Sequence, residues 1–157
     1  MADIVFRALD TDAVRALQRG GTDAYGNKPE ILISDGGGIP CRHCLERVKE
    51  GDAYLVLSYR PFDALQPYAE TGPIFLHADE CGRAADSGAL APMFDLGGSY
   101  ILRGYRANGW INYEVAEVVE AGRIVETAQA MLDRDDVAWL HMRSSRFNCY
   151  QARIERA

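Results

Sequence analysis

Four side chains of ligand type stand in two close pairs along this chain. Cys41 and Cys44 are separated by two residues, and His77 and Cys81 by three, with 32 residues between the pairs. Zinc takes four nitrogen or sulfur ligands on a tetrahedron, and two such pairs brought together by folding are the usual sequence form of a zinc site. The spacing therefore predicts a zinc site that joins two separate parts of the fold.

The first pair also allows two other interpretations. A Cys-x-x-Cys with an internal histidine, His43, at the start of a helix predicted over residues 44–49 would favour a thiolate and so a dithiol redox centre. A thioredoxin-like fold would have a buried strand directly before the motif, whereas a glycine-rich segment stands at residues 35–40. Free cysteine is also a common core residue. The third interpretation therefore treats all four cysteines as small buried side chains: Cys41, Cys44, Cys81 and Cys149.

Further residues are candidates for the surroundings of this site or for a pocket. Arg60 could bind an anionic ligand and Glu70 could transfer a proton, although the prolines and glycine around them also describe a plain connecting loop. His141 lies on the apolar face of a predicted strand, which favours a half-buried histidine over a ligand. Cys149 alternates with Phe147 and is expected in the core.

Composition sets the class of protein. With 157 residues, 48% hydrophobic and 25% charged, the chain is expected to form one soluble globular domain over residues 1–157. A net charge of -6 makes nucleic-acid binding unlikely on electrostatic grounds. No apolar run approaches the roughly 20 residues of a membrane span, and the N-terminus lacks a secretory signal. We therefore expect a cytoplasmic protein with reduced thiols and no membrane contact; a small-molecule ligand is possible and the partner is unknown.

The hydrophobic pattern predicts an α+β fold. Hairpins outnumber strand-helix-strand units, and Asn108-Gly109 supplies the positive φ angles of a type I′ hairpin turn. We expect a mainly antiparallel sheet of about seven short strands with two main helices. The helices are predicted from Asp10 to Gly20 and from Ile124 to Leu132. The strands are predicted at residues 4–9, 31–33, 53–59, 74–76, 99–106 with 110–113, and 137–143 with 147–154.

Four motifs follow one another along nearly the whole chain, at residues 40–45, 58–62, 72–81 and 139–156. Together they resemble an uncharacterised bacterial family catalogued as domain of unknown function 1203. The resemblance implies a small bacterial cytosolic protein and implies no activity. It also implies that the cysteine and histidine segments belong to the family pattern, which suggests one shared site. That site would contain Cys41, His43, Cys44, His77, Cys81, His141 and Cys149.

These observations favour a binding or scaffolding module whose Cys/His cluster is either a structural zinc site or a group of reduced thiols beside a small pocket. The alternative is a dithiol redox enzyme that uses Cys41 and Cys44, so the sequence leaves open whether the protein is an enzyme. A structural zinc would have four protein ligands, whereas a catalytic zinc would have one ligand displaced and Glu70 nearby.

Overall fold

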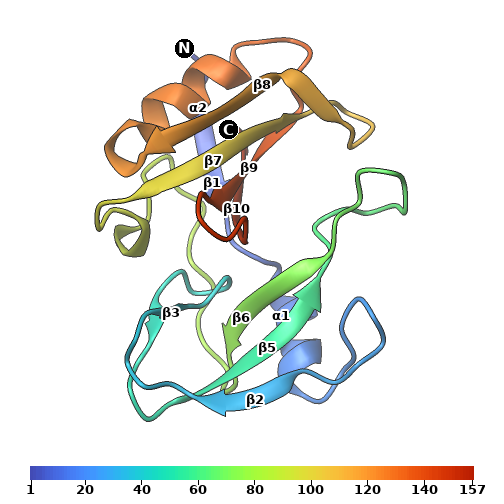
Figure 1. The fold of residues 1–157 in the computed structure, drawn as a ribbon, viewed down its shortest axis with the longest axis vertical. Coiled ribbons are helices and arrows are strands. Elements are labelled where there is room, and N and C mark those ends of the chain that lie inside the picture. The colour runs from blue at the N-terminus through green and yellow to red at the C-terminus, as the bar shows by residue number, and fades with distance from the viewer. The chain divides into compact units, whose positions relative to one another are not determined.

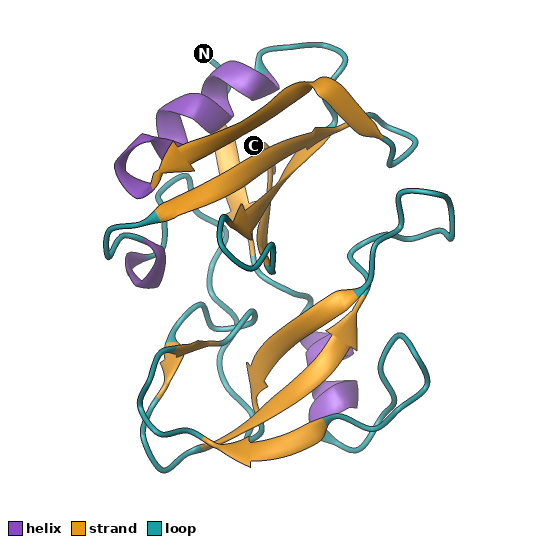
Figure 2. Cartoon of the chain, viewed as in Figure 1, coloured by secondary structure: helices purple, strands orange, loops and turns teal.

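The computed structural model describes all residues from 1 to 157, and they form ten strands, two α-helices and two short 3-10 turns (Figures 1 and 2). The fold is α+β with mainly antiparallel sheets, as predicted. There are ten strands rather than about seven, partly because β3 and β4 are only two residues long. The chain divides into two compact units, so the expectation of one domain stays a prediction. Unit 1 comprises residues 1–7, 62–69 and 85–157, and unit 2 comprises residues 8–61 and 70–84.

Unit 1 is built on a five-stranded sheet in the order β1-β10-β9-β7-β8, and every neighbouring pair is antiparallel. Its strands are β1 (Ile4–Arg7), β7 (Ser99–Tyr105), β8 (Ile111–Glu120), β9 (Trp139–Ser144) and β10 (Tyr150–Arg156). Its helical segments are α2 (Ile124–Leu132) and the 3-10 turns η1 (Pro92–Phe94) and η2 (Ala121–Arg123). Strand β1 precedes unit 2 in the chain, and the other four strands follow it.

Helix α2 forms because its apolar residues recur every four positions. Ile124, Ala128 and Leu132 thereby share one face, and all three are fully buried. The sheet contributes Leu140 and Met142 from β9 to the core, and both are fully buried. Unit 1 therefore has an ordinary apolar core between a helix and a sheet.

Both predicted hairpins of unit 1 are present. Gly109 has the positive φ of 81° that the turn between β7 and β8 requires.

Two predictions of burial in unit 1 were wrong. His141 is fully buried rather than half-buried, and Cys149 is half-buried rather than in the core. The alternation assumed for Cys149 does not apply, because β10 begins only at Tyr150 and Phe147 lies in the turn before it with 73% of its surface exposed.

Unit 2 contains a three-stranded sheet in the order β2-β5-β6 and a two-stranded sheet of β3 and β4. Its elements are α1 (Thr11–Gln18), β2 (Glu30–Ile33), β3 (Ile39–Pro40), β4 (Arg47–Val48), β5 (Ala53–Tyr59) and β6 (Gly72–His77). Asp10 caps α1 by accepting a hydrogen bond from the Ala13 N–H at 3.3 Å, as the sequence predicted. The apolar core of unit 2 consists mainly of Val14, Leu55, Leu57, Ile74 and Leu76.

The helix predicted over residues 44–49 is wrong. Residues 41–46 form a tight turn between the antiparallel strands β3 and β4. Leu45 has a φ of 55°, which no residue of an α-helix adopts, and the Cys41 N–H donates across the turn to the Glu46 carbonyl at 3.0 Å. The two thiols of the first pair are therefore held by a turn and not by a helix N-terminus.

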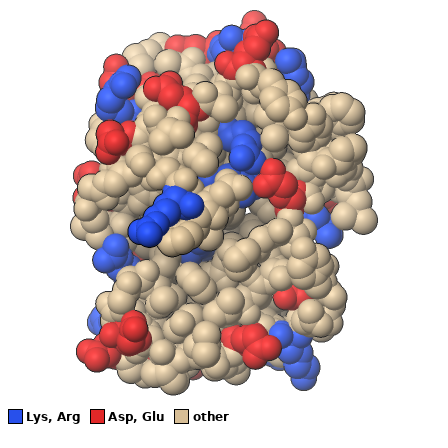
Figure 3. All heavy atoms as spheres, in the orientation of Figure 1, with Lys and Arg blue, Asp and Glu red and all other residues tan.

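The surface carries both signs of charge. Figure 3 shows acidic and basic side chains interspersed over the viewed face, without an extended basic area. Neither α-helix has the length and apolar character needed to cross a membrane.

Candidate metal centre

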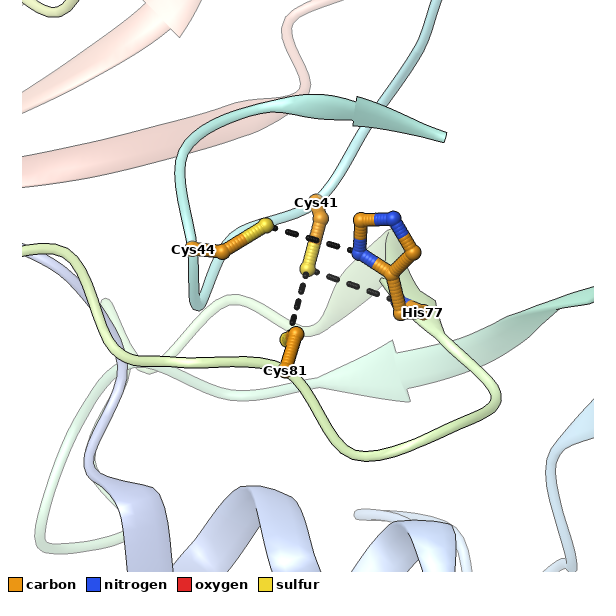
Figure 4. A group of neighbouring side chains, drawn as sticks. All are labelled: Cys41, Cys44, His77 and Cys81. Carbon is orange, nitrogen blue, oxygen red and sulfur yellow. Dashed lines mark hydrogen bonds between the residues drawn. The ribbon is translucent and has the colours of Figure 1, made fainter. Parts of the chain in front are cut away.

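Two separate segments of unit 2 bring the four predicted zinc ligands together (Figure 4). Cys41 and Cys44 lie in the turn between β3 and β4. His77 is the last residue of β6, and Cys81 lies in the loop that follows. The β3–β4 turn lies against the end of β6, since the Arg42 N–H donates to a β6 carbonyl at 3.2 Å.

Two distances within the group are close to the edges of a tetrahedral zinc site. The sulfur atoms of Cys41 and Cys81 are 3.9 Å apart, and Cys44 Sγ lies 3.4 Å from His77 Nδ1. All four ligand atoms lie within 4.8 Å of one another. Zinc bonds of about 2.3 Å to sulfur and about 2.0–2.1 Å to nitrogen give tetrahedral edges of roughly 3.5–3.8 Å. The group of three cysteines and one histidine could therefore hold a metal ion.

The turn also directs backbone donors at one sulfur atom. The N–H groups of His43 and Cys44 point at Cys41 Sγ, and the N–H of His77 donates to the same atom at 3.4 Å. Amide donors stabilise a thiolate, which is the form that binds metal. Cys41 is therefore prepared by its backbone surroundings to act as an anionic ligand.

Helix α1 fixes the loop that carries the second pair. Arg15 donates to the Cys81 carbonyl at 2.6 Å, and Gln18 donates to the carbonyls of His77 and Asp79 at 2.9 and 3.0 Å. These contacts hold the backbone of the loop on both sides of its ligands. The positions of His77 and Cys81 thus depend on side chains from a helix that supplies no ligand itself.

His43 supports the group from outside the ligand set. Its Nδ1 lies 3.2 Å from Cys81 Sγ, and its Nε2 lies 3.0 Å from the Thr11 hydroxyl. The ring is fully buried, and burial lowers its pKa, so it is neutral at physiological pH. When Cys81 is a thiolate, Nδ1 carries the proton and donates to sulfur, while the Thr11 hydroxyl donates to Nε2.

Three thiols this close resist ionising together. The hydrogen bond with the Cys44 thiol lowers the pKa of Cys41 well below its ordinary value, despite the opposing effect of burial. The same hydrogen bond raises the pKa of Cys44, and burial raises the pKa of Cys81. One negative charge is thus concentrated on Cys41, and a divalent cation would favour the further deprotonation that repulsion opposes.

An open pocket of about 560 Å³ borders the group. Cys44, His77 and Cys81 line it and are half-buried, whereas Cys41 is fully buried. The charged side chains of the pocket wall have both signs: Glu46, Arg47, Lys49, Asp52 and Arg83. The pocket gives a metal ion a path to the ligands, and its volume is within the range of small-molecule sites.

The other predicted site residues lie elsewhere. Arg60 and Glu70 belong to unit 2, but they are neither in the ligand group nor in the wall of the 560 Å³ pocket. Cys149 and His141 belong to unit 1. Buried among aromatic rings, His141 accepts a hydrogen bond at Nε2 from the Trp139 indole at 3.2 Å, and its Nδ1 has no hydrogen-bond partner.

Sequence reasoning missed three supporting residues on α1. Thr11, Arg15 and Gln18 stand four and three positions apart and so share one helix face. These polar residues lie beside the buried Val14, but nothing in the sequence showed that this face meets the ligand loop.

These features define an α+β protein with a preformed group of side chains that could hold a metal ion. The chain belongs to the family described as Protein of unknown function (DUF1203), whose pattern matches residues 38–156. This confirms the resemblance found in the four motifs. No curated protein and no solved structure matches the chain.

Proposed function

We propose that unit 2 binds one zinc ion through Cys41, Cys44, His77 and Cys81, and that the protein is a binding or scaffolding module whose fold depends on this ion. The observation that carries the proposal is the convergence of these ligand atoms within 4.8 Å, from segments far apart in the chain. Thiolate and imidazole ligands favour zinc over magnesium and calcium, which prefer oxygen.

A structural role for the ion follows from the number of ligands. Four protein ligands fill a tetrahedral coordination sphere and leave no position for a reactive water molecule. Glu70, the candidate for proton transfer, is absent from both the ligand group and the adjoining pocket. Binding or scaffolding is therefore a better account than hydrolysis, and the 560 Å³ pocket is the place where a small molecule would bind.

The cellular setting is part of the proposal. Zinc binding through three cysteines requires reduced thiols, which fits the cytoplasm of a bacterium. The net charge of -6 argues against a nucleic-acid partner.

Metal analysis tests the proposal directly. Protein prepared without chelators and without a nickel column should contain about one equivalent of zinc per chain. Cys41→Ser and Cys81→Ser should lose the metal, whereas Cys149→Ser is the matched control and should keep it. A wild-type protein that binds no zinc even when the ion is added would disprove the metal site.

The same samples test the dithiol alternative. A redox enzyme would lack stoichiometric metal and would form a reversible disulfide between Cys41 and Cys44, which mass spectrometry after alkylation would detect. The full burial of Cys41 and the presence of a third thiol, Cys81, at 3.9 Å favour the metal site over this alternative.

A further inference from the structure

Strand β2 forms an open, apolar edge of unit 2. It is the terminal strand of its sheet, and all four of its residues are exposed. Ile31, Leu32 and Ile33 expose 67%, 48% and 63% of their surface. Figure 1 shows β2 along the border of this sheet, with β5 as its neighbour. An exposed apolar edge strand is a template for pairing with another strand.

The unpaired backbone groups of this edge belong to Ile31 and Ile33. In an antiparallel pair, alternate residues point their N–H and C=O groups at the neighbouring strand. The Ser34 N–H donates to the Asp52 carbonyl at 2.9 Å, so Ser34 and, two residues earlier, Leu32 face β5. Ile31 and Ile33 therefore point their N–H and C=O groups outward, along the open edge.

The other edges of the two larger sheets are covered or charged. The outer edge of β6 receives a hydrogen bond from the Arg42 N–H to the Phe75 carbonyl at 3.2 Å, and β1 donates from Phe6 to Ser87 at 2.8 Å. Strand β8 carries three exposed acidic side chains, which discourage pairing: Glu114, Glu117 and Glu120. In contrast, the only charged residue of β2 is Glu30, at its first position.

We infer that β2 pairs with β2 of a second copy of this protein, antiparallel and about a two-fold axis at Leu32. Ile31 of each copy then lies opposite Ile33 of the other, and their outward N–H and C=O groups form four hydrogen bonds between the copies. The four isoleucines meet on one face of the joined sheet, and the two Leu32 side chains meet on the other. The result is a six-stranded antiparallel sheet that crosses the dimer.

The chemistry of neighbouring positions selects this register. An axis at Ile31 would place Ile33 opposite Pro29, which has no N–H to donate. An axis at Glu30 would place two carboxylates directly opposite each other, which is destabilising. An axis at Ile33 would place the apolar Ile31 opposite the charged Asp35. Of these four registers, only the axis at Leu32 uses both outward donors and sets apolar side chains against one another.

The dimer should be weak and reversible. Four residues from each copy bury less than the about 1,200–2,000 Å² of a stable interface, so the dimer should dissociate on dilution. The inference does not depend on zinc, because none of the metal ligands lies on β2.

Analytical ultracentrifugation of the full chain over a wide concentration range tests the pairing. Wild-type protein should show a reversible monomer–dimer equilibrium, and Ile33→Lys should raise the dissociation constant by roughly tenfold or more. Val118→Lys is the matched control, since Val118 lies on the edge strand β8 with 62% of its surface exposed. A wild-type protein that stays monomeric, or a dimer that survives Ile33→Lys, overturns the inference.

Cross-linking tests the register. In the proposed dimer the two Leu32 residues form a non-hydrogen-bonded pair with Cα atoms about 4.5 Å apart, which a disulfide can span. Leu32→Cys should therefore form a covalent dimer on mild oxidation well above the background of wild-type protein. Ile33→Cys, whose opposite residue is Ile31, should not. Equal cross-linking of both variants would contradict the register.

Discussion

The two units of this protein bury apolar side chains to different extents. In unit 1, α2 buries four residues against the sheet, namely Ile124, Thr127, Ala128 and Leu132. In unit 2, α1 buries only Val14, and β2 buries none of its residues. Small folds with thin cores commonly need a metal or a disulfide to be stable. The ligand group lies in the unit that has less apolar packing to hold it together.

The same residue types also play different parts in the two units. In unit 2, cysteine and histidine form the ligand group and its support, His43. In unit 1, His141 is packed against aromatic rings, including Tyr105 at 4.5 Å between ring centres, and the Cys149 thiol donates to the Phe147 carbonyl. A cysteine or histidine is thus a ligand candidate only where turns bring several of them within a few ångströms.

Removing the metal should have the largest effect on stability and should affect unit 2 but not unit 1. Structural zinc contributes about 10–16 kcal/mol of apparent binding free energy in zinc-finger peptides, so its chelation should unfold unit 2. Hydrogen exchange followed by mass spectrometry should show loss of protection in β5 and β6 and retained protection in β7 and β9. Equal loss in both units, or no loss in either, would contradict the comparison.

Truncation of the apolar core of unit 1 should destabilise unit 1 and leave zinc binding by unit 2 unchanged. Leu140 is fully buried in β9, and Leu140→Ala should lower the free energy of unfolding of unit 1 by about 2–5 kcal/mol. The zinc content should not change, as measured on the same sample. Leu76 is fully buried in β6, next to His77, and Leu76→Ala is the matched variant in unit 2. A fall in zinc affinity for Leu140→Ala but not for Leu76→Ala would reverse the assignment.

Loss of His43 should weaken the metal site without abolishing it. Residues that hydrogen-bond to metal ligands typically contribute 10–100-fold in affinity, so His43→Ala should lower the zinc affinity by about that factor. Competition with a chromophoric chelator measures the change. Thr11→Val, which removes only the hydroxyl next to His43 Nε2, should have a smaller effect in the same direction. Unchanged affinity in His43→Ala would show that the Cys81 contact does not support the ligand.

Acid should weaken unit 1 through His141. Burial, together with the charges of Arg143, Arg153 and Arg103, holds the pKa of His141 well below its ordinary value. Unfolded histidine titrates near about 6.5, so below this pH the unfolded chain binds a proton that the folded chain does not. The contribution is complete above that pH and decreases as pH falls, by up to about 1.4 kcal/mol per pH unit. Urea unfolding of unit 1 should show this slope in wild type and a smaller one in His141→Phe.

Much of the fold could be predicted from local patterns. The predicted strand at residues 53–59 has the bounds of β5, and the apolar spacing predicted α2. One exception is β8, which continues to Glu120 instead of ending at Tyr113 as predicted. The other is the segment after Cys44. Its side chains suit a helix, but the positive φ of Leu45 and the pairing of β3 with β4 override that preference. A positive φ is usually indicated in a sequence by glycine or asparagine, so a leucine with this conformation could not be predicted.

The two ligand pairs could be recognised in the sequence because closely spaced cysteines and histidines have few explanations other than a metal or redox site. The residues that orient them were not. Arg15 and Gln18 act through hydrogen bonds to carbonyls more than 50 residues away, and any polar residue on an exposed helix face looks the same in the sequence. The division into two units was also invisible, because residues 62–69 belong to unit 1 while the chain on either side belongs to unit 2.

Strand β1 pairs with β10 from Ile4 opposite Arg156 to Arg7 opposite Arg153, so the first of the ten strands to be synthesised pairs with the tenth. Until residue 150 is synthesised β1 lacks its strand partner β10, whereas all four residues of the ligand group are available once residue 81 has emerged. Unit 2 can thus mature on a nascent chain whose other half is still incomplete. If unit 2 binds zinc as proposed, a ribosome that stalls before residue 150 would leave a zinc-bound unit 2 joined to a sheet that lacks β10.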